Sequence, residues 1–147
     1  MKDTTSRFLE IRNNKGDIIV AKIEYFIDED RRCTLKFNCH LTNKLIFVDS
    51  DFFECLIQLR KELDKYNYYP LCNGARVDVY PSGMCRDMGN GLGAYIQIPN
   101  KKVNIEDLVD IFNFAEPNLI ASVDEQYKFF KSFISSERIQ NSSELEL

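Results

Sequence analysis

The sequence has no tryptophan, a single histidine and no long apolar run. A Cys/His metal site or a histidine-dependent nucleophile would both need His40, and that residue falls on the polar side of an alternating segment, where an exposed role is expected. No stretch of about 18 apolar residues is present, so no transmembrane helix is expected. The first eight residues lack the apolar core of a signal peptide, which predicts a protein of the cytoplasm.

Cysteine is present in an odd number and without any CxxC pair. A disulfide framework or a zinc ribbon would show tighter and paired spacing. We therefore expect reduced thiols that pack as small apolar side chains. The five residues concerned are Cys33, Cys39, Cys55, Cys72 and Cys85.

The chain also lacks a large net charge of either sign: its formal net charge is −4. A general nucleic-acid binder would need a basic face, so this class is disfavoured. The 147 residues, 44% hydrophobic and 29% charged, are typical of one globular domain. We assign that domain to residues 1–136 and an acidic, frayed tail to 137–147.

The first third of the chain has the pattern of a β-meander. Segments 8–12, 18–27 and 33–41 are rich in β-branched, aromatic or alternating apolar residues, and turn-forming residues separate them. A short strand is expected at 45–48. In 33–41 the alternation has no error, which predicts a half-buried antiparallel strand.

Two helices are indicated by capping boxes followed by apolar residues at helical spacing. Asp51 and Glu54 open a helix expected at 51–66, and Ser122 opens one at 122–136. Between them, residues 104–112 fit a short helix, with a strand as the alternative.

Glycine is concentrated in one place, because five of the six glycines lie between residues 72 and 95. Such residues are needed where the backbone takes φ > 0 or passes close to another group. We expect strands over 75–80 and 92–98, joined by an irregular loop at 81–91. Together these elements predict an α+β domain: a mainly antiparallel sheet of five to six strands with two or three helices on one face.

No motif in the chain predicts catalysis, a cofactor or a metal. Residues 89–93 read GxGxG before a strand, whereas a dinucleotide fingerprint needs GxGxxG before a helix. Ser82 lacks the flanking pattern of a nucleophile elbow. Asp49, Asp51 and Glu54 could bind a divalent ion, but carboxylates at a helix start more often cap it.

Charged residues in the glycine-rich stretch allow two interpretations. Arg76, Asp78, Arg86 and Asp87 either form local ion pairs that hold the loop, or form a recognition patch beside the tyrosines. The residues alone favour neither.

The same stretch resembles the signature of a family of small bacterial proteins. The resemblance rests on Leu-Cys-Asn-Gly-Ala-Arg, Val-Tyr-Pro-Ser-Gly-Met and Arg-Asp-Met-Gly-Asn-Gly, together with 107–112 and 125–130. It covers residues 71–133. The family includes immunity proteins of contact-dependent growth inhibition and related polymorphic toxin systems.

The resemblance implies a binding function without catalytic residues. The partner would be the C-terminal domain of a cognate toxin, often a nuclease with a basic cleft, and an acidic inhibitor would select it by complementary charge. The partner-binding residues we expect are Asp78, Tyr80, Arg86 and Asp87, with Asp28, Glu29 and Asp30 as a second, acidic patch. The alternative is a small-molecule-binding domain or small enzyme that uses the 81–93 loop, with Arg76, Arg86 and Tyr80 around a small anion.

Overall fold

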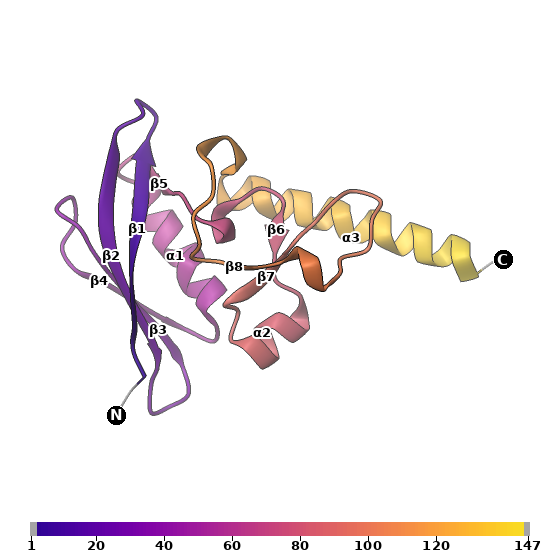
Figure 1. Ribbon diagram of the computed structural model, residues 1–147, viewed down its shortest axis with the longest axis horizontal. Helices are drawn as coiled ribbons and strands as arrows, with labels where there is room; N and C mark the ends of the chain where they lie inside the picture. Colours follow the sequence, from indigo (N-terminus) through magenta and orange to yellow (C-terminus); the bar gives the residue numbers. More distant parts are fainter. Residues whose placement is uncertain (1–2, 146–147) are drawn as a thin grey trace.

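The computed structural model describes residues 3–145, and the side chains of residues 3–136 (Figure 1). The fold is α+β, as predicted, and its described part contains two antiparallel sheets and three α-helices. The larger sheet, helix α1 and the smaller sheet follow one another along the long axis of the molecule, and helix α3 runs beside the smaller sheet and extends beyond it. No helix within this part of the chain is long and apolar enough to span a membrane.

The first sheet has five strands in the order β4-β3-β2-β1-β5. Four of them form the predicted meander, since each pairs with its neighbour in sequence. Alternation decides the faces: Leu35 and Phe37 are fully buried, whereas Lys36 and Asn38 on the other face are not. The strands are β1 (Thr5–Asn13), β2 (Ile18–Ile27), β3 (Cys33–Asn38), β4 (Leu45–Asp49) and β5 (Tyr68–Pro70).

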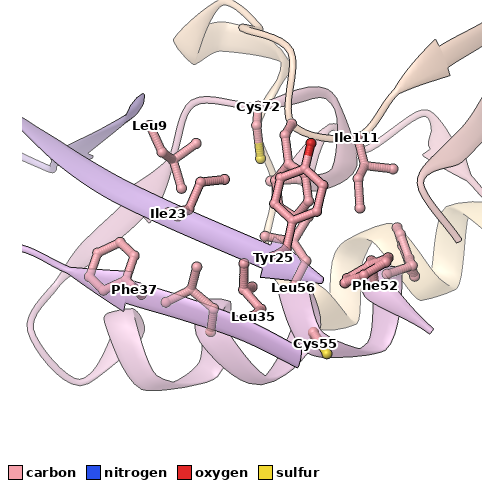
Figure 2. Close-up of a cluster of buried hydrophobic side chains, with 14 of the residues drawn as sticks. Leu9, Ile23, Tyr25, Leu35, Phe37, Phe52, Cys55, Leu56, Cys72 and Ile111 are labelled. Carbon is pink, nitrogen blue, oxygen red and sulfur yellow. The ribbon is translucent and has the colours of Figure 1, made fainter. Parts of the chain in front are cut away.

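Helix α1 (Phe52–Asp64) covers the buried face of this sheet. Its apolar side chains meet those of the strands in one core, of which Figure 2 shows a part. Cys33, Cys55 and Cys72 are buried there, and all five cysteines are free thiols. Burial is the main cause that raises the pKa of Cys33 to about 11, and of Cys55 and Cys72 to about 12.

The second sheet joins three short strands in the order β6-β7-β8. They are β6 (Val79–Tyr80), β7 (Gly93–Ile96) and β8 (Leu108–Asp110), accompanied by the 3-10 helices η1 (Asn73–Ala75), η2 (Ile105–Asp107) and η3 (Pro117–Leu119). Arg7 of β1 links the two sheets, because its guanidinium lies 3.0 Å from the Asp110 carboxylate of β8.

The glycine-rich stretch differs most from the sequence prediction. Residues 75–80 do not form one strand: 73–75 are a 3-10 helix, and only Val79–Tyr80 pair with β7. The expected loop contains helix α2 (Gly83–Gly89), which Ser82 caps through a hydrogen bond from the Cys85 N–H. Residues 104–112 form η2 and β8, so the strand alternative is correct for 108–110.

Helix α3 (Val123–Leu145) begins one residue after its predicted capping residue. Ser122 and Glu125 exchange the two expected hydrogen bonds. The helix includes 137–145, which the sequence assigns to a separate tail; fraying of these residues stays a prediction, and 146–147 lie outside the described part.

Candidate functional site

Residues 72–80 run through the middle of the molecule between α1, β8 and α3. The backbone of Cys72 forms an isolated antiparallel β-bridge with Phe114, and that of Arg76 forms one with Ile120. At Gly74 a β-carbon would clash with the Leu56 side chain and lie 2.9 Å from Ile111 Cβ. Glycine is therefore needed at this position because two neighbouring elements leave no room for a side chain.

Gln126 of α3 fixes the same segment from the other side. Its buried amide nitrogen lies within hydrogen-bond distance of three carbonyl oxygens, those of Gly74, Arg76 and Val79, at 2.8–2.9 Å. Its oxygen accepts a bond of 2.6 Å from Arg60 of α1. One side chain thus joins both long helices to the central segment.

The charged residues of the stretch form mainly ion pairs inside the protein. Arg76 donates two hydrogen bonds to the Asp78 carboxylate, at 2.8 and 2.9 Å. Arg86 lies 2.9 Å from Asp51 and 3.0 Å from Glu54, at the start of α1. The structure therefore supports the local ion-pair interpretation for Arg76, Asp78 and Arg86.

Arg86 also lies over the rings of Phe53 and Tyr80, 5.2 and 5.7 Å from their centroids. Burial lowers the pKa of Arg86, but hydrogen bonds and charge from Asp51 and Glu54 outweigh burial and leave the pKa raised. Glu54 thus pairs with α2 instead of completing the predicted capping box, whereas Asp51 does cap α1 by accepting a bond from the Glu54 N–H.

Tyr80 is mostly buried, with its ring stacked on Phe130 at a centroid distance of 4.0 Å. Burial is the largest cause of its raised pKa. Tyr80 also lines a cavity of about 220 Å³, and neither Arg76 nor Arg86 belongs to that lining, so this cavity is not the anion pocket that the ligand-binding alternative expects.

Helix α2 carries the exposed part of the stretch. Met84 and Met88 are 74% and 82% exposed and lie one helical turn apart. Asp87 is exposed beside them and forms no ion pair within the described residues. Of the four expected partner-binding residues in this stretch, only Asp87 is freely accessible.

An open cleft of about 690 Å³ separates one end of the first sheet from the connection between α2 and β7. The aromatic residues Tyr25, Phe26 and Phe52 belong to its lining, and the described lining contains no Lys, Arg or His. The Phe26 ring has the Lys36 ammonium over it, 5.4 Å from its centroid. Three carboxylates also line this acidic cleft: Asp3, Asp28 and Glu29. A backbone hydrogen bond of 2.7 Å from the Phe52 N–H, at the start of α1, to the Asn90 carbonyl joins two parts of this lining.

The turn between β2 and β3 positions the second predicted patch. Asp28 accepts bonds of 2.9 Å from the N–H groups of Asp30 and Arg32, which sets the path of the turn. Glu29 and Asp30 are exposed, and only Glu29 of these two lines the cleft. Arg31 and Arg32 are exposed on the same turn, outside the lining.

The residues considered above for metal binding or catalysis, Asp49 and His40, lie apart from the cleft. Asp49 accepts a bond of 2.6 Å from Gln58, and His40 is exposed after β3. Within residues 3–136, no three His, Cys, Asp or Glu side chains are grouped to hold a metal ion.

Sequence reasoning missed the aromatic wall of the cleft. Tyr25 and Phe26 stand in a predicted strand and Phe52 in a predicted helix, where aromatic residues indicate core packing. The proximity of β2 to residues 90–92 is a long-range contact that no local pattern indicates. Comparison with protein-family models gives no match, and comparison with curated proteins gives none either.

Proposed function

We propose that the protein is an immunity protein, which binds the C-terminal domain of a cognate toxin and neutralises it. The partner surface would be basic, as expected for a nuclease that binds RNA or DNA. The protein would act by occlusion, covering the active site without performing any reaction itself.

The acidic cleft is the observation that carries this proposal. Three carboxylates and the aromatic residues Tyr25 and Phe52, with no cation in the lining, match a Lys or Arg side chain from a basic partner. Glu29 and Asp3 form no hydrogen bond or ion pair among the described residues, so their charge remains available to a partner.

Exposed methionines on α2 supply apolar contact area next to the cleft. Asn90, which ends α2, and Leu92 both line the cleft. Methionine adapts to irregular partner surfaces and is common at binding faces. An interface that joins the cleft to α2 would include Asp28, Glu29 and Asp87 from the predicted set.

Co-expression with the C-terminal domain of the toxin encoded by the neighbouring gene tests the proposal. The wild-type protein should restore growth and bind the purified domain in calorimetry. Glu29→Lys should weaken binding by about tenfold or more, because it places a cation opposite a basic partner.

Asp30→Lys is the matched control, since it makes the same change of charge on the same turn but outside the cleft lining. It should weaken binding less than Glu29→Lys. Equal loss in both variants would assign the effect to net charge and not to the cleft. Failure of the wild-type protein to bind the toxin domain would refute the function.

A further inference from the structure

A separate cavity of about 180 Å³ lies at the C-terminal end of α1, whereas the acidic cleft touches the first residue of that helix. The start of α3 and strand β5 complete its walls. Arg60 and Lys61 contribute cationic groups to the lining, and Asp64 and Asp124 contribute carboxylates.

Arg60 is only 5% exposed, and it forms no ion pair with any carboxylate among the described residues. Its hydrogen bonds go to neutral oxygens: the carbonyls of Gly74 and Ala121, and Oε1 of Gln126. Burial lowers the pKa of Arg60 to about 10, so the guanidinium remains charged at neutral pH. A buried charge without a carboxylate partner is costly to the folded protein.

The guanidinium also keeps unfilled donors. Of its five N–H groups, the three bonds above use two on Nη1 and one on Nη2. The N–H on Nε and the second on Nη2 have no acceptor among the described residues. These neighbouring nitrogens have the spacing that the two oxygens of a carboxylate match.

Strand β5 and helix α3 form the other walls of the cavity. Tyr68 and Tyr69 of β5 belong to the lining, and their hydroxyls accept hydrogen bonds from Asn13 and Arg12 of β1, which fixes both rings against that strand. The first turn of α3 adds the positive end of a helix dipole. Asp64 and Asp124 oppose a second negative charge, so a dianion fits less well than a monoanion.

We propose that this cavity binds a small monocarboxylate, with the two carboxylate oxygens on the free Nε and Nη2 donors of Arg60. Lys61 attracts the ligand, and Asp64 limits its charge. The site is independent of the proposed toxin binding, because it lies at the other end of α1 and its assay contains no partner protein.

Titration of the ¹⁵N-labelled protein with sodium acetate tests the proposal, with sodium chloride at equal ionic strength as reference. Amide signals of Lys61, Ser122 and Val123 should shift and saturate in acetate but not in chloride. Lys61→Gln should weaken acetate binding by about two- to fivefold, and Asp64→Asn should tighten it by a similar factor. Both residues are exposed, so these variants should keep the fold.

Arg60→Lys keeps the charge but removes the two-donor edge, and it should abolish the saturable shifts. Lys15→Gln, in the β1–β2 turn, should leave the affinity unchanged. Acetate shifts that follow those of chloride, or equal affinities in the Lys61 and Asp64 variants, would overturn the site. Tighter binding of phosphate than of acetate would overturn the choice of ligand. If Arg60→Lys fails to fold, Lys61→Gln and Asp64→Asn still test the site, because they are expected to change the acetate affinity in opposite directions.

Discussion

At the residue scale, four of the five glycines of the central stretch fall into two clear groups. Gly74 lies against Leu56 and Ile111, and at Gly91, whose φ is +72°, a β-carbon would lie 2.8 Å from Asp51 Oδ1. Gly83 and Gly89 have open space where a side chain would stand. Packing therefore explains Gly74 and Gly91, but it does not explain the glycines at the two ends of α2.

Gly74→Ala should lower the free energy of unfolding by about 1–3 kcal/mol, because the new methyl group overpacks the space between Leu56 of α1 and Ile111. Urea unfolding followed by circular dichroism measures the change.

Gly83→Ala is the control, since its methyl group meets no atom within 4 Å. It should leave stability unchanged or raise it by about 0.5 kcal/mol. Equal losses in the two variants would contradict the role assigned to Gly74.

At the element scale, α2 is fastened to the start of α1 by one side chain. Arg86 binds both Asp51 and Glu54, and none of the residues of α2 is buried. The helix has only seven residues, too few to be stable in isolation. Its formation therefore depends on this anchor and on the Ser82 cap.

Arg86→Gln should lower the free energy of unfolding by about 1.5–3 kcal/mol, because Asp51 and Glu54 lose the cation that both of them bind. Hydrogen exchange should show greater loss of protection in 83–89 than in α1.

Lys65→Gln is the comparison for this variant, because it removes an exposed ion pair with Glu62. Its cost should stay below about 0.5 kcal/mol. Unchanged exchange in α2 of the Arg86 variant would show that the anchor is not what holds the helix.

Patterns in the sequence predict the elements whose faces differ in burial. The alternation of 33–38 and the apolar spacing of 52–64 gave correct strand and helix assignments, since one face of each is buried. Helix α2 was missed because no apolar face marks it. The 75–80 alternation was misleading because η1 ends within it.

The candidate site was predictable only in part, for a similar reason. Glu29 and Asp87 stand out as exposed charges in turn and loop patterns, and the structure leaves both accessible. The pairing of Arg86 with Asp51 joins residues 35 positions apart, and no local pattern indicates it. The same is true of the aromatic wall of the acidic cleft.

At the scale of the whole molecule, the buried thiols make stability depend on alkaline pH. Cys55 and Cys72 keep their protons to about pH 12 in the folded protein, whereas their ordinary pKa is 9.0. Between these values only the unfolded chain releases the protons, so rising pH favours unfolding. Arg60 acts in the opposite sense, but only above about pH 10.

The free energy of unfolding should therefore fall as pH rises from 9 to 10, by about 1 kcal/mol for each of these two thiols. Cys72→Ala should reduce the slope by one such contribution, although it is less stable at neutral pH.

Leu71→Ala also removes a buried side chain but no ionisable group. It should lower stability by the same amount at each pH and keep the wild-type slope. A Cys72→Ala slope equal to that of the wild type would contradict the ionisation account.

The three carbonyl contacts of Gln126 carry a consequence for biosynthesis. Residues 74–79 emerge from the ribosome well before the glutamine that secures them, and β5 and α1 are translated earlier still. The nascent chain can form the β1–β4 meander early, but its middle has to wait for the last helix. A message truncated before codon 126 would therefore yield a polypeptide that proteases recognise, and not a smaller working protein.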